Sequence, residues 1–168
     1  IIKFRWKQND KGISNLTNLT KLSLIWENVY DNYTISDRGI ENLINLTHLN
    51  LSDNEVITDD GLINLTNLTD LQISDNDQIT DQSLIHLSKL LSLDIDLNNR
   101  ITDKGIISLI NLRTLYLGEN FNITNNGISS LTNLTFLCLN LNDNITDDGL
   151  NTNISTLRLH HNNKISDN

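Results

Sequence analysis

The sequence predicts an α/β solenoid, a curved right-handed rod with a parallel sheet along its concave side and short helical or 3₁₀ turns along its convex side. Three observations lead to this prediction. Apolar residues recur at a step of 22 residues, shortened to 20 in the last unit. Each unit contains a short run with strand alternation and a short run with the chemistry of a helix start. A fixed period of this length is typical of stacked structural repeats.

Two apolar columns set the period. One is isoleucine at residues 35, 57, 79, 101, 123, 145 and 165, and the other is leucine at residues 49, 71, 93, 115, 137 and 157. One unit, residues 46–67, reads LTHLNLSDNEVITDDGLINLTN, and the working consensus is LxxLxLxxNxxITDxGLxxLxN. Within LxLxx the leucines alternate with polar residues, which is the period of a strand with one buried face. We therefore expect one short strand per coil, paired with its neighbours.

The second half of each unit predicts a short convex turn. A Thr or Ser that can cap a helix is followed in most coils by an Asp that suits a helix N-terminus. Behind it, Leu62, Leu65 and Leu68 recur every three positions, a spacing typical of a 3₁₀ turn or one helical turn. One slot holds only small residues, which predicts a need for small size rather than for a positive φ angle. Its occupants are Gly39, Gly61, Ser83, Gly105, Gly127 and Gly149.

A column of asparagines falls where the chain should leave the sheet. Its members are Asn54, Asn76, Asn98, Asn120, Asn142 and Asn162. A buried amide offers both donors and an acceptor, and buried polar groups must be paired. We therefore expect these side chains to bond the backbone of neighbouring coils, a structural role.

The LxxLxLxxN core, repeated over nearly the entire chain, resembles the leucine-rich repeat family. The NLTNLT run and the 22-residue length resemble the internalin type of repeat, whereas ITDxGL resembles the class found in F-box receptors. The resemblance implies a horseshoe-shaped solenoid that recognises another macromolecule. It brings no catalytic residue with it.

Residues 1–168 are predicted to form a single domain of about eight coils with incomplete terminal coils. Residues 2–4 are a candidate first strand, and an insertion of five residues around 29–34 carries Tyr30 and Tyr33. Residues 165–168 stop within a convex segment without a polar capping unit, which solenoid ends normally need. We expect either a fragment of a longer array or an open end covered by another subunit.

Composition narrows the classes of partner. A net charge of −9 disfavours nucleic acid and anionic membranes and leaves protein partners with basic or neutral surfaces. There is one cysteine, no 18-residue apolar run and no signal-peptide pattern, and the 11 Asn-x-Ser/Thr acceptors fall in packed coils. The expected location is the cytoplasm, and no cofactor is expected.

The outward strand positions vary from coil to coil while the leucines do not, which indicates a face that folding leaves free. Aromatic residues and arginine dominate binding hot spots, and acidic residues gather in the middle coils. The candidate partner contacts are Trp26, Asp70, Asp94, Asp96, Tyr116, Phe136, Arg158 and His160.

Catalytic and metal sites are weakly indicated. Cys138 and His160 should lie one diagonal step apart, too far for a nucleophile and its base without movement. His160 and His161 should point to opposite sides of a strand and share no metal. Asp94 and Asp96 with Ser74 could hold a hard cation such as calcium, but a solvated acidic patch is favoured because the EF-hand spacing is absent.

The sequence thus predicts a non-catalytic protein-interaction module that uses its concave face. The resemblance of ITDxGL to F-box proteins keeps open the substrate-recognition part of a ubiquitin ligase receptor. A structural spacer with end-to-end self-association is a third alternative. A cell-surface adhesin like the internalins is a fourth, disfavoured because no secretion signal is in view.

Overall fold

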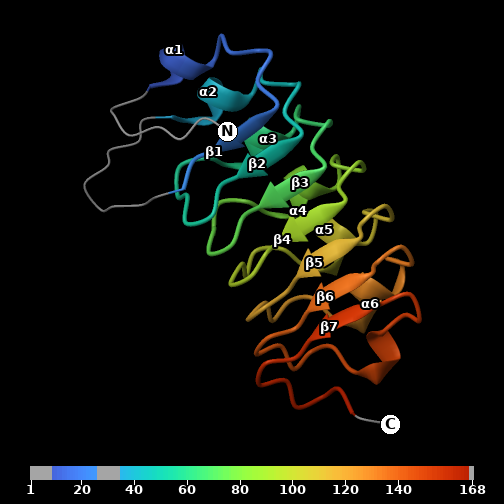
Figure 1. The fold of residues 1–168 in the computed structure, drawn as a ribbon. Coiled ribbons are helices and arrows are strands. Elements are labelled where there is room, and N and C mark those ends of the chain that lie inside the picture. The colour runs from blue at the N-terminus through green and yellow to red at the C-terminus, as the bar shows by residue number, and fades with distance from the viewer. Residues whose placement is uncertain (1–8, 26–34, 167–168) are drawn as a thin grey trace.

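The chain winds as a solenoid in the computed structural model, which describes residues 9–25 and 35–166 (Figure 1). One parallel sheet contains seven strands in chain order. The strands are β1 Lys21–Ser23, β2 His48–Asn50, β3 Asp70–Gln72, β4 Ser92–Asp94, β5 Thr114–Tyr116, β6 Phe136–Cys138 and β7 Thr156–Arg158. Leu49 pairs with Leu71 and Leu71 with Leu93, which confirms the predicted register. The candidate strand at 2–4, the insertion around 29–34 and Trp26 lie outside the described residues.

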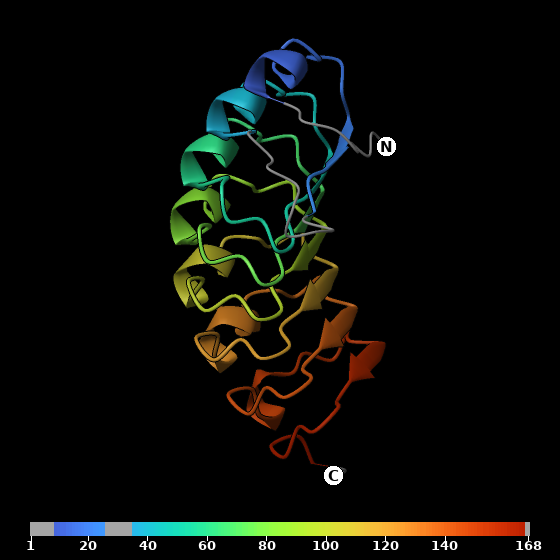
Figure 2. The same cartoon turned by 90° about the vertical axis from the view of Figure 1, so that its left-hand side faces the viewer.

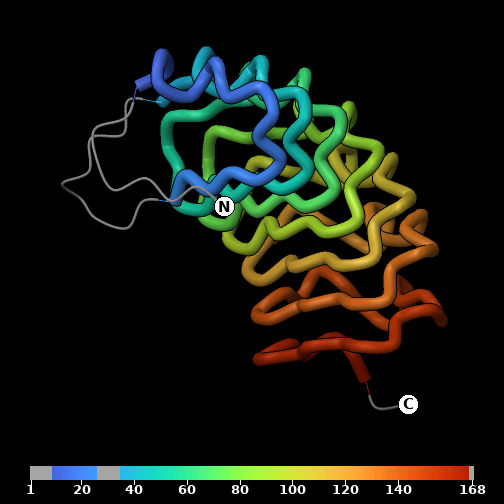
Figure 3. The backbone as a smooth tube through the Cα atoms, turned by 45° about the horizontal axis from the view of Figure 1, so that its top comes forward, coloured from blue at the N-terminus to red at the C-terminus, as the bar shows by residue number. Residues whose placement is uncertain are grey.

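Short helical turns form the opposite wall and confirm the predicted convex side. They are α1 Asp10–Ile13, α2 Asp37–Ile40, α3 Asp59–Leu62, α4 Asp81–Leu84, α5 Asp103–Ile106, α6 Asn125–Ser129 and the 3₁₀ turn η1 Asp147–Gly149. Figure 2 shows the helices on the outer side of a gentle arc and the strands on its inner side, and Figure 3 shows the coils stacked one on the next. The sheet therefore lines the concave side.

The core lies between the sheet and the helices. Each coil contributes inward leucines and isoleucines, such as Leu93, Ile95 and Ile101 in one coil, and these three side chains are fully buried. Burying each such side chain contributes about 1.5–3 kcal/mol relative to leaving it exposed. Because neighbouring coils repeat the same contacts, the core is continuous along the rod.

The asparagine column bonds successive coils together, as the sequence predicts. The side-chain amide of Asn98 donates to the Asn76 carbonyl at 2.6 Å, and its oxygen accepts from the backbone N–H groups of Arg100 at 2.9 Å and Ile101 at 3.2 Å. The residue before each asparagine has a left-handed backbone, which the sequence analysis did not anticipate because none of these residues is glycine. They are Asp53, Asp75, Leu97, Glu119, Leu141 and His161, with φ between 50° and 59°.

A second ladder joins the convex turns. The carboxylate of Asp81 accepts from the backbone N–H of Thr102 at 2.8 Å and from its hydroxyl at 2.7 Å. Thr102 in turn caps α5 by accepting from Lys104 N–H at 3.3 Å. The predicted threonine caps are present in α3 to α6. The prediction is wrong at the start of α2 and of η1, where the side chains of Ser36 and Thr146 make no cap bond.

The small-residue slot exists because of this ladder. A Cβ on Gly105 would lie 2.5 Å from the Asp81 carboxylate oxygen and 3.2 Å from the Asp81 Cα atom. No glycine in the described part of the chain has a positive φ angle. The prediction that small size is what matters is confirmed, and its cause is the aspartate of the preceding coil.

Candidate binding face on the sheet

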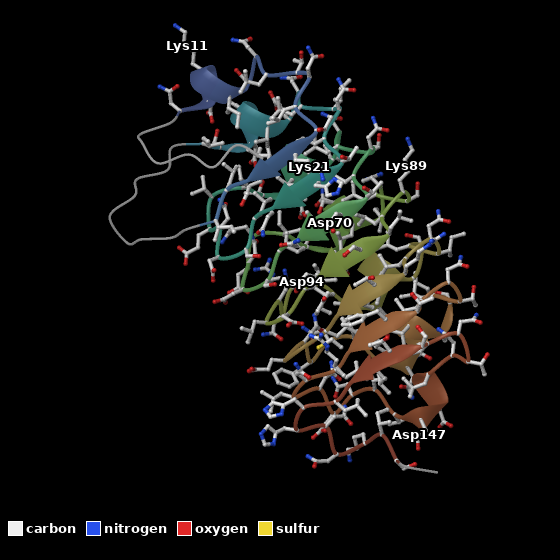
Figure 4. All side chains as sticks on the ribbon, viewed as in Figure 1. Lys11, Lys21, Asp70, Lys89, Asp94 and Asp147 are labelled. Carbon is white, nitrogen blue, oxygen red and sulfur yellow. The ribbon has the colours of Figure 1, made fainter. Side chains whose placement is uncertain are left out.

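The outward side chains of the strands form columns along the concave side. The pairing register aligns the central column, which runs Asn50, Gln72, Asp94, Tyr116, Cys138 and Arg158. Adjacent members are one inter-strand step apart, about 4.8 Å. Figure 4 shows Asp70 and Asp94 along the sheet, on the neighbouring strands β3 and β4.

An aromatic and cationic cluster occupies β5 to β7. Tyr116 and Phe136 are diagonal neighbours, as predicted, with ring centroids 5.0 Å apart and planes tilted by 44°. The Cζ atom of Arg158 lies 5.3 Å from the centroid of the Phe136 ring. Such a cation–π contact contributes about 0.5–1 kcal/mol at an exposed site. The three side chains therefore form one surface whose outer edge carries a positive charge.

Two aspartates lie beside this cluster on the β4 coil. Ser74 hydroxyl donates to Asp94 Oδ1 at 2.7 Å, and Gly118 N–H donates to Asp96 Oδ1 at 2.5 Å. Burial raises the pKa of Asp96 to about 6, the Gly118 N–H opposes the rise, and the charges of Asp94 and Glu119 add to it. The face therefore carries two carboxylates on the β4 coil and a guanidinium on β7.

Two of the hollows in the described N-terminal coils lie over the sheet or at its flanking turns, and the sequence did not predict them. One, of about 320 Å³, lies over β1 to β3 and is lined by Lys21, Leu22, Ser23, Ile25, His48, Leu49, Asn50, Asp70 and Gln72. The other, of about 360 Å³, lies at the turns after β2 and β3 and is lined by Asp53, Glu55, Asp75, Asp77 and Gln78. The carboxylates of Asp53 and Asp75 therefore belong to the turns beside the sheet.

Asp70 takes part in a polar row across the first of these hollows. Gln72 amide donates to Asp70 Oδ1 at 3.2 Å, and Asn50 amide donates to Gln72 Oε1 at 2.5 Å. Asp70 is thus separated along the sheet from the aromatic cluster. Of the candidate contacts, the structure brings together Asp94, Asp96, Tyr116, Phe136 and Arg158, with His160 on the last coil.

Two expectations from strand alternation are wrong. Cys138 occupies an outward register position, but its side chain is only 2% exposed, and this burial raises the pKa of its thiol. The rings of His160 and His161 lie 4.1 Å apart instead of on opposite sides. The reason is that β7 ends at Arg158 and His161 has a left-handed backbone, so the chain is no longer an extended strand there.

Within residues 9–25 and 35–166, no group of three or more histidine, cysteine, aspartate or glutamate side chains is arranged to hold a metal ion. No helix in that same part of the chain has the length and apolar character to cross a bilayer.

A strand, a buried asparagine and a short convex turn, repeated coil after coil, define the leucine-rich repeat class, and comparison with known proteins agrees. A family model described as a leucine-rich repeat matches residues 42–65, 64–88 and 86–110. The chain belongs to the leucine-rich repeat family. Members of this family are typically non-catalytic, and the fold generally serves protein interaction.

Among solved structures the chain is similar to internalins of Listeria monocytogenes. Internalin C2 is 34% identical, with a TM-score of 0.72, over 90% of this chain and 66% of that one. The internalin inlF is 26% identical, with a TM-score of 0.65, over 96% of this chain and 60% of that one. This chain therefore spans at most about two thirds of either relative. No curated protein matches it in sequence.

Proposed function

We propose that this chain is a non-catalytic module that binds another protein, one with a basic or neutral surface, through the concave face of its sheet. The observation that carries the proposal is the arrangement on β4 to β7, where the half-buried aromatic rings of Tyr116 and Phe136 lie between charges of opposite sign. Aromatic and arginine side chains contribute most of the binding energy in protein interfaces.

Charge favours a protein partner over a nucleic acid. The chain carries 21 acidic and 12 basic side chains, and phosphate contacts by Lys and Arg supply most nucleic-acid affinity. The middle of the face carries Asp94 and Asp96, whose carboxylates would repel phosphates and attract Lys or Arg side chains of a partner.

Three side chains of the face take no part in the hydrogen-bond ladders that join the coils. The ladders use the asparagine column and the convex aspartates, whereas Tyr116, Phe136 and Arg158 contact one another through their rings and guanidinium. Side chains that the fold does not need can vary to suit a partner.

The test is selection from a random 12-residue peptide library displayed on phage, with the folded chain immobilised. The concave variant replaces Tyr116 and Phe136 by Ala, and the matched control replaces Ile85 and Ile107 by Ala, two apolar residues on the convex side that are each 48% exposed. We expect selected clones to bind the wild type and the convex control equally and to lose most binding to the concave variant. Clones that bind all three alike would refute the assignment of this face.

A further inference from the structure

The central column places two charges of opposite sign at a fixed separation, with aromatic rings between them. Asp94 lies on β4 and Arg158 on β7, and the register aligns them through Tyr116 and Cys138. Three inter-strand steps of about 4.8 Å separate their backbones by about 14 Å. Because Arg158 leans over the ring of Phe136, its guanidinium lies toward the aromatic pair.

Neither charge is neutralised by the surrounding protein. Asp94 Oδ1 accepts from Ser74 and from Asp96 N–H at 3.2 Å, but Asp94 Oδ2 has no hydrogen-bond partner among the described residues. Arg158 is exposed, its guanidinium lies over the Phe136 ring, and it forms no ion pair within residues 9–25 and 35–166. An unpaired carboxylate and an unpaired guanidinium are complementary to a partner that carries the opposite charges in the same order.

We propose that this face binds an extended protein segment that runs along the solenoid axis and carries a basic residue at i, an apolar or aromatic residue at i+2 and an acidic residue at i+4. The basic side chain pairs with Asp94, the middle one packs on Tyr116 and Phe136, and the acidic one pairs with Arg158. This inference rests on the proposed function and specifies the chemistry of its partner.

The spacing favours an extended segment over a helix. An extended chain rises about 3.3 Å per residue, so i and i+4 are about 13 Å apart, and i, i+2 and i+4 all point to one side. The residue at i+2, about 7 Å along, falls between β5 and β6, where the two rings lie. In a helix the same separation takes about nine residues at 1.5 Å each, and nine steps of about 100° place the second charge on the opposite side.

The experiment continues the peptide selection with a charge-reversed chain. Arg158→Glu changes an exposed side chain, and circular dichroism and urea unfolding verify that the variant is folded. We expect clones selected on the wild type to share the basic, apolar, acidic spacing and to bind Arg158→Glu about tenfold more weakly, because an exposed ion pair is replaced by like charges. Selection on Arg158→Glu should return a basic residue at i+4 instead.

Synthetic peptides of equal composition supply the control for spacing. A peptide with Lys, Phe and Glu at i, i+2 and i+4 is compared by fluorescence anisotropy with one that has the three residues in succession. We expect only the first to bind, and to lose affinity for Arg158→Glu.

The outcomes separate this inference from the proposed function. Clones that lose binding to the Tyr116 and Phe136 double variant but show no such spacing, or ignore the charge reversal, would overturn the inference and leave the concave face as the binding site. Clones indifferent to both variants would overturn both. A selection that returns no clone dependent on this face would also overturn the inference, because 12 residues contain the whole five-residue pattern.

Discussion

The hydrogen bonds of the asparagine column should contribute strongly to the stability of the fold, and the Asn98→Ala variant tests this. The side chain is fully buried and makes three hydrogen bonds, to the Asn76 carbonyl and from the N–H groups of Arg100 and Ile101. Alanine leaves all three backbone groups without these partners. Two of the bonds are buried, and a buried polar group left unsatisfied costs about 1–3 kcal/mol. We expect the free energy of unfolding to fall by about 3 kcal/mol.

Asn99→Ala is the matched control, because it removes the same side chain one residue further on. Asn99 is exposed, and its side chain makes no hydrogen bond within the described part of the protein. Its backbone carbonyl still accepts from Asn122 at 2.7 Å in the variant. We expect a change in the free energy of unfolding of less than about 0.5 kcal/mol, as is usual at surface sites.

The measurement is equilibrium unfolding in urea, followed by circular dichroism. With a slope of about 2 kcal/mol per molar, a loss of about 3 kcal/mol lowers the midpoint by about 1.5 M. Asn98→Asp is a second arm, in which an oxygen replaces the amide that donates to the Asn76 carbonyl, and it should cost at least as much as alanine. If Asn98→Ala unfolds within about 0.5 kcal/mol of Asn99→Ala, the ladder does not stabilise the fold in the way argued.

Three further predictions follow from the packing and the pKa shifts. Gly105→Ala should lower the free energy of unfolding, measured in urea, by about 1–3 kcal/mol, because the clash of the new methyl with Asp81 outweighs the roughly 1 kcal/mol that alanine gains in a helix. Ser83→Ala in the same slot should be nearly neutral. A Gly105→Ala variant more stable than the wild type would refute the clash. Asp96 has a pKa of about 6 in the fold, above its ordinary 3.8, so its contribution to stability is full below about pH 4 and is lost as pH rises to about 6. Asp96→Asn should therefore raise the free energy of unfolding by about 1 kcal/mol at pH 7. The full pKa shift corresponds to about 3 kcal/mol, and solvent screening reduces it. If the variant is still more stable than the wild type in urea unfolding at pH 3.5, this reasoning is wrong. Cys138 should react with Ellman's reagent at pH 8 only as the chain unfolds, because its thiol is buried and its pKa is raised; rapid labelling of the folded chain would refute the burial.

The parts of the fold that repeat were open to prediction from the sequence. A leucine at every twenty-second residue can be buried by every coil only if the coils stack in register, and Leu49, Leu71 and Leu93 do pair in that way. The role of the asparagine column was equally predictable, because a polar residue buried at a fixed point of an apolar repeat needs hydrogen-bond partners.

What escaped prediction depends on contacts between coils rather than on pattern within one. Asp81 reads as a helix-start residue, and its bonds to Thr102, 21 positions away, become visible only when the coils are stacked. The left-handed backbone at Leu97 could not be predicted from a glycine at that position. The asparagine that follows, Asn98, stabilises the turn by accepting from the backbone N–H of Arg100. Strand alternation places Cys138 outward and does not predict that its side chain is only 2% exposed.

Within each coil, the residues that stabilise the stacking differ from those of the outward face proposed to bind a partner. Stability comes from leucines, asparagines and aspartates whose partners lie in the next coil, so it is nearly a sum over adjacent coils. Among the outward side chains from β4 to β7, Tyr116, Phe136 and Arg158 enter that sum through ring contacts worth about 0.5–1.5 kcal/mol each. A substitution at Arg158 can therefore change what the face attracts while leaving the stacking intact, whereas the same freedom does not exist at Asp81 or Asn98. Recognition and folding are carried by different residues of the same short repeat, which is why a change in partner specificity here requires no change in fold.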